Sequence, residues 1–319
     1  MIRLSIIIPF YNVEKYIAEC LDSVYNQDIS EEEYEVICVN DASPDNSSDI
    51  VLEYQKKHSN LILVEHEVNK KLGAARNTGR KIARGKYIWN VDSDDMIVPN
   101  CLGEILKQCE DGNLDILCFS KKDLHDDGIL ISDTMRDSIS PTSGIDFIHR
   151  YDGDKLGALC PVWRYVFRME FLSENNIYSP EINMGEDVPY TFKSLFLAKR
   201  IAYVSEAWYV YRRNVNSLTG SKKELHPDVL YEKCFKNTWM ILDVLQYLPE
   251  EETNIRNSCT NVAKFTFRLW SDFYKMMDNE NKKAFRLICR KRYSNDKKML
   301  KQIMSRRKYC CYLLWMFGI

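Results

Sequence analysis

The stretch YIWNVDSDD, residues 87–95, runs from an apolar segment into a group of acids. Residues 87–89 are typical of a buried strand, and Asp92, Asp94 and Asp95 follow within a few positions. Like charges this close repel one another, and the edge of a hydrophobic core is a costly place to leave them unbalanced. The stretch therefore predicts a strand that ends in an acidic loop, where a bound cation balances the charge.

Asp92 and Asp94 are the candidate ligands of that cation. Because they are two residues apart in an extended segment, their side chains point to the same side, whereas Asp95 points away and could orient them. A hard divalent cation prefers oxygen ligands and needs few from the protein when a diphosphate supplies the rest. The alternative is a solvated loop in which an aspartate caps the helix expected after Pro99.

Short apolar runs alternate with helical periods over residues 1–120. Strands are predicted at residues 4–8, 35–39, 61–65, 86–91 and 114–120, and helices at 13–26, 45–58, 71–84 and 99–108. This order predicts an α/β fold with a parallel sheet covered by helices on both faces, in which ligands bind beyond the carboxyl ends of the strands. Residues 9–12, 40–45 and 92–95 follow three of these ends, and we expect one ligand site at that edge.

Beyond residue 120 the pattern changes twice. Residues 121–145 are polar with a short strand expected at 129–132, and then an extended segment, a helix and two strands are expected at 161–168, 186–198, 201–204 and 208–212. From about residue 225 onward, helix follows helix with few glycines or prolines. We expect an α/β domain over residues 1–220, with halves at about 1–120 and 121–220, and a helical region at 221–319.

Composition argues against several classes of protein. The chain has 319 residues, 45% of them apolar and 28% charged, so it can bury a core and is not expected to be disordered. The 11 cysteines form no C-x-x-C pair and the 5 histidines are scattered, which argues against a zinc site and indicates reduced thiols of the cytosol. The first residues do not resemble a signal peptide, and no run of about 18 apolar residues predicts a membrane span.

The last part of the chain is strongly basic. Residues 281–319 contain 12 lysines and arginines and a single acid, Asp296, whereas the whole chain has a net charge of −2. A basic tail on an acidic body predicts a localised anionic partner such as a membrane surface, while no recognition motif supports nucleic-acid binding. The alternatives are a helical cap or a homodimer contact made by the apolar residues Leu313, Leu314, Trp315 and Phe317.

Two polar stretches and one helix start hold further candidate residues. Asp41 follows the second strand and suits a hydrogen bond from a base or a sugar, although an Asx-turn is the alternative. Beside the backbone bend at Pro9, Tyr11 could stack on a flat base or pack on the surface. Glu186 and Asp187 open a predicted helix, where they could interact favourably with the helix N-terminus or supply a general base.

The segment NKKLGAARNTG, residues 69–79, places Gly73 and Arg76 near the start of a helix, where an anionic ligand would be stabilised. The alternative is that Arg76 and its basic neighbours form a solvated helix face. The spacing matches neither G-x-G-x-x-G nor a P-loop, so dinucleotide-dependent oxidoreductases and P-loop kinases lose support.

Taken together and in order, SIIIPFYN, VNDASPDNS, GAARNTG, VDSDD and GED resemble the motifs of the family 2 glycosyltransferases of the GT-A fold, over about residues 3–215. The resemblance implies a Rossmann-like, mostly parallel sheet with a nucleotide-sugar half and an acceptor half. It also implies inverting transfer of a hexose or an N-acetylhexosamine from a UDP-sugar to a hydroxyl of a lipid-linked or cell-surface glycan. Mn²⁺ or Mg²⁺ would be the cofactor, and the enzyme would work at the inner face of the cell membrane.

The resemblance also implies roles for single residues. Donor-binding residues would be Pro9, Tyr11, Asn12, Asp41, Arg76, Asn77, Asp92, Ser93 and Asp94. Asp92 and Asp94 end the family's D-x-D motif and would hold the metal, with Asp92 also near the ribose. Asp187 would be the catalytic base, with Glu186 as its neighbour. Residues near the acceptor or the diphosphate would be Trp163 and Arg212.

Two other functions compete with this interpretation. A sugar-phosphate nucleotidyltransferase has a related sheet but wants a glycine-rich loop with Arg and Lys after the first strand, where this chain has PFYN. A non-catalytic nucleotide-sugar-binding or membrane scaffold protein would be signalled by loss of the D-x-D or G-E-D acids, and both are present.

One departure from the family concerns Lys71, where many relatives have Gly, and Gly73, where a small residue such as Ser is common.

Overall fold

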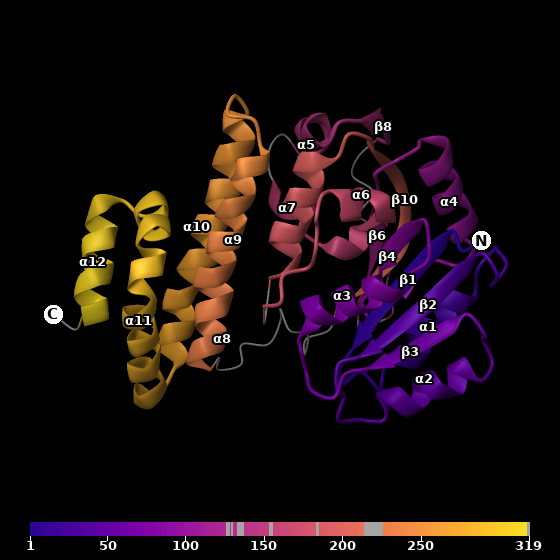
Figure 1. The fold of residues 1–319 in the computed structure, drawn as a ribbon, viewed down its shortest axis with the longest axis horizontal. Coiled ribbons are helices and arrows are strands. Elements are labelled where there is room, and N and C mark those ends of the chain that lie inside the picture. Colours follow the sequence, from indigo (N-terminus) through magenta and orange to yellow (C-terminus); the bar gives the residue numbers. More distant parts are fainter. Residues whose placement is uncertain are drawn as a thin grey trace. The chain divides into compact units, whose positions relative to one another are not determined.

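The computed structural model describes residues 1–125, 128, 130–132, 137–152, 156–182, 185–213 and 226–317. Most of its helices and strands are labelled in Figure 1. The chain forms two compact units. The first comprises Met1–Gly153, Pro161–Glu181 and Ser194–Ser221, and the second comprises Asp154–Cys160, Ile182–Lys193 and Lys222–Ile319. The functional division expected near residue 220 stays a prediction.

In the first unit, the described residues form a ten-stranded sheet in the order β3-β2-β1-β4-β9-β6-β10-β5, with β7 beside β6 and β8 beside β10. The strands are β1 (Leu4–Phe10), β2 (Tyr34–Asn40), β3 (Leu61–Glu65), β4 (Tyr87–Asn90), β5 (Met96–Ile97), β6 (Ile116–Leu124), β7 (Leu130–Ser132), β8 (Ile139–Thr142), β9 (Tyr165–Arg168) and β10 (Ile201–Arg212). Strands β1 to β4, β6 and β10 run in one direction, and the remaining described strands run against it. The mostly parallel sheet is therefore confirmed, with antiparallel β9 inserted between β4 and β6.

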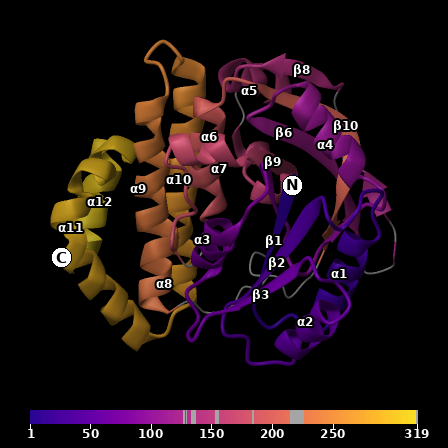
Figure 2. The same ribbon diagram turned by 45° about the vertical axis from the view of Figure 1, so that its right-hand side comes forward.

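The helices of the first unit cover both faces of this sheet, which is why all seven residues of β1 are buried. They are α1 (Ile17–Tyr25), α2 (Ser47–Gln55), α3 (Leu72–Ile82), α4 (Leu102–Asp111), α5 (Gly144–Asp152) and α6 (Met169–Glu174). Ile6 and Ile8 join the core on the face of α1, α2 and α4, whereas Ile7 lies against Gly79 of α3. Figure 2 shows α3 on one side of β1 to β3 and α1 and α2 on the other.

The structure corrects two of the expected elements beyond residue 120. The two strands expected at 201–204 and 208–212 are one strand, β10, whose pairing with β6 shifts register on both sides of Ala207. The shift absorbs the polar residues Ser205 and Glu206, so the strand continues although the apolar pattern breaks. The extended segment expected at 161–168 begins instead with a 3₁₀ turn, η2 (Val162–Arg164), before β9.

The second unit is helical, as expected for the end of the chain. Its described elements are η1 (Leu156–Leu159), the start of α7 (Asp187–Leu197), α8 (Pro227–Tyr231), the π-helix η3 (Glu232–Lys236), α9 (Asn237–Asp243), η4 (Val244–Tyr247), α10 (Thr253–Met276), α11 (Asn279–Ile303) and α12 (Arg306–Phe317). Aromatic rings fill its core, and the ring of Phe235 lies 4.9 Å from that of Phe267 and 6.1 Å from that of Phe285, measured between centroids.

The apolar end of the tail packs in part on this core. The ring centroid of Trp315 lies 4.5 Å from that of Trp270, and Tyr312 is buried, whereas Leu314 is 48% exposed. The side chain of Phe317 lies outside the described residues. In the described part of the chain, no helix combines the length and the apolar character needed to cross a bilayer.

Candidate active site

The carboxyl ends of β1, β2 and β4 lie at one edge of the sheet because these strands are adjacent and parallel. Just past those ends, the Asp41 N–H donates to the carbonyl of Phe10 (3.0 Å) and the Val91 N–H donates to the carbonyl of Ile7 (2.9 Å). The three polar stretches that follow the strands therefore start side by side, as the strand order predicted.

Arg76 of α3 balances the first acid of the loop. Its Nη2 donates to Oδ1 of Asp92 at 2.9 Å, and the Arg76 side chain is 3% exposed, compared with 26% for Asp92. Arg80, one turn further along α3, donates to the carbonyl of Ile177 and to Oγ of Ser173. The alternative of a solvated basic helix face is therefore wrong for both arginines, which tie α3 to the acidic loop, to α6 and to the segment that follows α6.

Asp95 is buried and held by β10. Its Oδ2 accepts a hydrogen bond from the hydroxyl of Tyr209 at 2.7 Å, and its Oδ1 accepts one from the Arg212 N–H at 2.8 Å. Burial raises the pKa of Asp95 well above its usual range, and the charges of Asp94 and Asp92 raise it further. Asp95 thus points away from the open side of the loop and fixes the loop to the sheet.

Tyr209 connects both ends of the acidic loop. Its hydroxyl oxygen accepts a hydrogen bond from the Asp92 N–H at 3.1 Å while its proton goes to Asp95. The ring is fully buried and stacks on Trp163, with the ring centroids 4.4 Å apart. A buried phenol in a packed aromatic stack has little freedom, so it sets where the loop backbone lies.

The carboxylate of Asp94 differs from those of its neighbours. Burial raises its pKa above the usual range, while its own backbone N–H and the charge of Arg212 act in the opposite direction. Arg212 donates from Nε to the backbone carbonyl of Asp94 at 3.0 Å and pairs through Nη2 with Glu19 at 2.5 Å. Among the described residues, no side chain donates a hydrogen bond to the Asp94 carboxylate.

These carboxylate oxygens suit a hard divalent cation, because a half-buried carboxylate without a side-chain donor is stabilised by an ion that binds oxygen. In the described part of the chain, no group of three or more His, Cys, Asp and Glu side chains is arranged to hold a metal by itself. Asp94, with Asp92 beside it, would therefore hold the ion only together with oxygens from a ligand, such as a diphosphate.

The helix-cap alternative for the acidic loop is wrong. The helix that follows, α4, begins at Leu102, and its first N–H groups are bound by other residues. Gln27 Oε1 accepts from the N–H groups of Cys101 (3.0 Å) and Leu102 (3.3 Å), and Asp28 Oδ1 accepts from that of Gly103 (2.9 Å). The loop acids are therefore not needed for capping.

Asp41 lies in a separate, buried hydrogen-bond network at the same edge. It is 4% exposed, and its carboxylate accepts from the N–H groups of Lys70 (2.7 Å) and Lys71 (2.8 Å). Nδ1 of His66 lies 2.8 Å from Asp41 Oδ1, and Nε2 of the same ring lies 2.9 Å from Oγ1 of Thr78. The local turn is made by Asn40, which accepts from the Ser43 N–H at 2.8 Å, so the Asx-turn alternative does not describe Asp41.

The departure from the family at Lys71 and Gly73 has a structural basis. Lys71 has φ 77° and ψ 163°, a conformation that is almost restricted to glycine. The bond from its N–H to Asp41 holds this strained backbone in place. At Gly73, a Cβ atom would overlap the carbonyl oxygen of Pro180, so a serine cannot replace this glycine without moving the backbone.

The remaining residues expected to bind the sugar donor differ in whether the protein already binds their side chains. Tyr11 is 48% exposed beside the buried Pro9, and Asn12 has φ 57° with its N–H bound to Oγ of Ser43 at 2.6 Å. The side-chain amide of Asn77 instead bonds twice to the backbone of Ser179, at 2.8 and 2.9 Å. Ser93, between the two D-x-D acids, is 6% exposed. Asn77 thus anchors a neighbouring loop, whereas Tyr11 is accessible to a ligand.

A match to a known protein family identifies the family of this chain. The family described as glycosyl transferase family 2 matches residues 5–168, about half of the chain and the part that holds the acidic loop. The chain belongs to glycosyl transferase family 2. The matched part includes Trp163 but ends before Glu186, Asp187 and Arg212.

Relatives of this family 2 chain are longer than it is. The uncharacterized glycosyltransferase EpsJ of Bacillus subtilis is 34% identical over 220 residues, which are 67% of this chain and 62% of EpsJ. The poly(ribitol-phosphate) beta-glucosyltransferase of Bacillus spizizenii is 36% identical over 211 residues, which are 66% of this chain and 32% of that protein. The chain thus spans less than two thirds of the length of these relatives.

A solved structure of the family confirms the predicted GT-A fold. The crystal structure of residues 1–349 of TarS from S. aureus, in complex with UDP-GlcNAc, superposes with a TM-score of 0.70 at 25% identity. The superposition covers 89% of this chain and 79% of that chain. It therefore extends beyond the family match into the helical end of the chain.

The remaining expected site residues of the family 2 chain are Trp163, Glu186 and Asp187. Trp163 is 5% exposed, and its carbonyl accepts from Nε1 of Trp89 at 2.8 Å, so it supports the site from within the core. Asp187 begins α7 and Glu186 precedes it, 6% exposed, both in the second compact unit. The roles expected for these residues stay proposals.

Two residues that shape the site were not predicted from the sequence. Tyr209 was expected only as part of a strand, and His66 was one of the scattered histidines. The signal for Tyr209 was its place in the run WYVYR, where alternate residues share a face of the strand. For His66 no such signal exists, because its partners Asp41 and Thr78 are distant in the chain.

Proposed function

We propose that this chain is an inverting, metal-dependent glycosyltransferase that moves a sugar from a UDP-sugar to an acceptor hydroxyl. The observation that carries the proposal is the acidic loop at the open edge of the sheet, in which Asp92 is paired with Arg76 while no described side chain donates to the Asp94 carboxylate. Membership of family 2 and the superposition on a UDP-GlcNAc complex of TarS support it.

The donor would bind across the edge formed by β1, β2 and β4. Tyr11 would stack on the uracil, beside the bend at Pro9 and Asn12, while Asp41 accepts from the base or the ribose. Asp41 keeps this capacity because a carboxylate has about four acceptor positions and the protein donors described above use three of them. Arg76 and Asn77 would support the nucleotide through the loops that they hold in place.

Asp94 and Asp92 would hold Mn²⁺ or Mg²⁺, with Ser93 between them. When bound, the ion neutralises the charge that grows on the departing diphosphate. The protein's own contribution is to present two carboxylates in a fixed geometry, because Tyr209 and Arg212 bind the loop backbone and Asp95. Arg212 would also act near the diphosphate, and Trp163 would support the acceptor side.

Asp187 would take the proton of the acceptor hydroxyl, with Glu186 as its neighbour. The hydroxyl oxygen then forms a bond to the anomeric carbon as the bond from that carbon to the diphosphate breaks, and UDP leaves from the opposite face. One proton moves to Asp187, one C–O bond forms and one breaks, and the configuration inverts. No covalent enzyme intermediate is needed.

The acceptor would be a lipid-linked or cell-surface glycan, and the sugar a hexose or an N-acetylhexosamine. The names of relatives that act on poly(ribitol-phosphate) support a polymeric surface acceptor. A cytoplasmic location at the inner face of the membrane and a homodimer contact through the tail belong to the same proposal, and the membrane contact is argued separately below.

Titration calorimetry with a panel of nucleotide sugars, with and without Mn²⁺, tests the donor half of the proposal. We expect Mn²⁺-assisted binding of a uridine diphosphate sugar, and Asp94→Asn should remove the effect of Mn²⁺ and abolish transfer. Binding that ignores Mn²⁺, or release of pyrophosphate instead of UDP, would contradict the proposal.

Asp187→Asn tests the base. Loss of a positioned general base should lower kcat by about 10²–10⁴-fold while UDP-sugar affinity is kept. Asp49→Asn is the matched control, because Asp49 is an exposed acid in the first turn of α2 and is expected to change only the favourable interaction with a helix N-terminus. Equal activity of the two variants would remove Asp187 from its role.

A further inference from the structure

The outer face of α11 carries a line of basic side chains, which we call the basic stripe: Lys283, Arg290, Lys291, Lys297, Lys298 and Lys301. Seven residues are nearly two turns of a helix with about 3.6 residues per turn, so Lys283, Arg290 and Lys297 lie above one another. Lys291 and Lys298 repeat the same spacing beside them. All six side chains are exposed, and the 25-residue helix is about 37 Å long at about 1.5 Å per residue.

The opposite face of α11 is fixed to the helical core. Phe285, Cys289, Met299, Leu300 and Ile303 are buried on it. The sole acid of the segment, Asp296, is also on this face, and both of its oxygens accept from the hydroxyl of Tyr231, at 2.9 and 2.8 Å. The helix therefore cannot rotate to hide the stripe, and its acid cannot neutralise the stripe.

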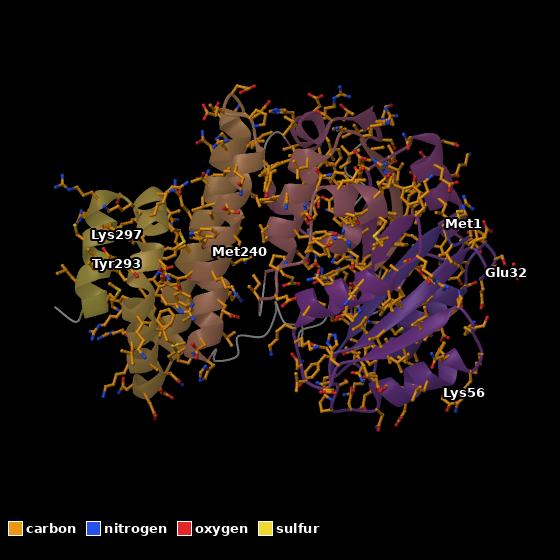
Figure 3. All side chains as sticks on the ribbon, in the orientation of Figure 1. Met1, Glu32, Lys56, Met240, Tyr293 and Lys297 are labelled. Carbon is orange, nitrogen blue, oxygen red and sulfur yellow. The ribbon has the colours of Figure 1, made fainter. Side chains whose placement is uncertain are left out.

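The lysines of the stripe have no acidic partner. Among the described residues, no ion pair involves Lys283, Lys291, Lys297, Lys298 or Lys301. Lysines such as Lys56 and Lys107 differ, since each pairs with a glutamate three residues earlier in the chain. Arg290 donates to the carbonyl of Met316 and so braces α12. Figure 3 labels Lys297 on α11, with Tyr293 one turn before it.

The composition of the face favours a bilayer over a defined phosphate site. Five of the six stripe residues are lysines, which act as point charges, whereas a site built to grip individual phosphates would favour the forked arginine side chain. Leu287, 50% exposed, lies within the stripe, and Leu314 is exposed on α12 with Cys310 and Cys311. An anionic bilayer surface can bury an apolar side chain and at the same time neutralise the cations around it.

We propose that the basic stripe of α11 docks the protein onto a membrane surface that contains anionic lipid, with Leu287 entering the headgroup layer. The proposal does not depend on the transfer reaction, since it concerns binding alone. The membrane contact is made by the basic stripe and not by the apolar residues at the end of the tail, most of which pack on the helical core.

Vesicle co-sedimentation of the full chain tests this, with phosphatidylcholine vesicles with and without phosphatidylglycerol. The test variant combines Lys291→Gln, Lys297→Gln, Lys298→Gln and Lys301→Gln. The matched control combines Lys56→Gln, Lys57→Gln, Lys107→Gln and Lys199→Gln, which removes the same charge from exposed lysines of the first unit. Circular dichroism melts establish that both variants are folded.

We expect the wild type and the control to bind vesicles that contain phosphatidylglycerol and not those without it. The stripe variant should bind about 10³-fold more weakly, because four basic residues near an anionic surface contribute about 1 kcal/mol each. The same positions changed to arginine should retain binding, since the charge is kept. Equal binding of stripe variant and control would overturn the proposal.

A second variant separates a bilayer from a soluble polyanion. Leu287→Asn should weaken vesicle binding and leave retention on a polyphosphate or duplex DNA resin unchanged, because only a bilayer offers an apolar layer to enter. Tight binding to either resin by a wild type that ignores anionic vesicles would assign the stripe to a soluble polyanion and overturn the membrane assignment.

Discussion

The hydroxyl of Tyr209 donates a 2.7 Å hydrogen bond to the carboxylate of Asp95 and accepts a 3.1 Å hydrogen bond from the backbone N–H of Asp92. Strand β10 thereby holds a loop that follows β4, more than a hundred residues earlier in the chain. Because Tyr209 is fully buried, this connection excludes water and fixes the loop in a low-dielectric setting. The position of the candidate metal ligands therefore depends on a residue that touches neither metal nor donor.

Tyr209→Phe is predicted to loosen the acidic loop. The change leaves Asp95 with one donor fewer and the Asp92 N–H without its acceptor, which should lower the free energy of unfolding by about 1–3 kcal/mol. We expect Mn²⁺-dependent UDP affinity to fall as well, measured by calorimetry. The phenylalanine preserves the stacking on Trp163, so a change in affinity reports the hydroxyl and not the ring.

Tyr203→Phe is the control for this prediction. Tyr203 is also a buried tyrosine of β10, and its hydroxyl bonds to Oγ of Ser120 instead of the acidic loop. We expect a comparable loss of stability with unchanged UDP affinity. If both variants lowered UDP affinity equally, the loop would not be positioned by Tyr209.

Asp296→Asn is predicted to change how stability depends on pH. Burial raises the pKa of Asp296 above its usual range, although its bond to Tyr231 and the charge of Arg292 oppose the rise. A raised folded-state pKa means that the protonated acid stabilises the fold below the ordinary carboxyl pKa, and that this stability is lost as pH rises through the raised pKa. The neutral, equally sized asparagine should raise the melting temperature at neutral pH.

Thermal melts of both proteins at a series of pH values measure this effect. The wild type should lose stability from acidic toward neutral pH relative to the variant, and the two should converge where Asp296 is protonated in both states. A variant less stable than the wild type at neutral pH would show that attraction to the charge of Arg292 outweighs the effect of burial on Asp296.

Lys71→Gly is predicted to stabilise the protein. Lys71 adopts φ 77° and ψ 163°, which costs a residue with a side chain on the order of 1–3 kcal/mol, whereas glycine adopts it freely. Glycine also has more freedom in the unfolded chain, so we expect a net gain of about 1 kcal/mol, read from denaturant unfolding. A loss of stability would show that the lysine side chain makes a compensating contact.

Gly73→Ala is predicted to destabilise the start of α3. The new methyl group would overlap the carbonyl oxygen of Pro180, which is backbone and cannot rotate away, so the cost should be about 1–3 kcal/mol. Gly103→Ala is the control, because its methyl group would meet only the side chain of Asp28, whose displacement costs no more than its hydrogen bond from the Gly103 N–H. Equal melting temperatures for both variants would contradict this difference.

Much of the fold could be predicted because its signals are local. The apolar run of β1, the helical period of α3 and the turn from β4 into the acids are each contained in a short stretch, and each is present with its ends shifted by a few residues. The single strand β10 was harder to predict because Ser205 and Glu206 interrupt its pattern, and only pairing with β6 carries it across them.

The sequence by itself determined that acids, a buried strand and a helix with Arg76 would meet at one edge of a parallel sheet, because period and strand order are properties of the chain alone. Only the tertiary structure decided how the acids are divided among partners. Arg76 pairs with Asp92, Tyr209 and the Arg212 N–H donate to Asp95, and no described side chain donates to the Asp94 carboxylate. The physical reason is that hydrogen bonds between residues far apart in the chain depend on distances of a few tenths of an ångström, which no local pattern records.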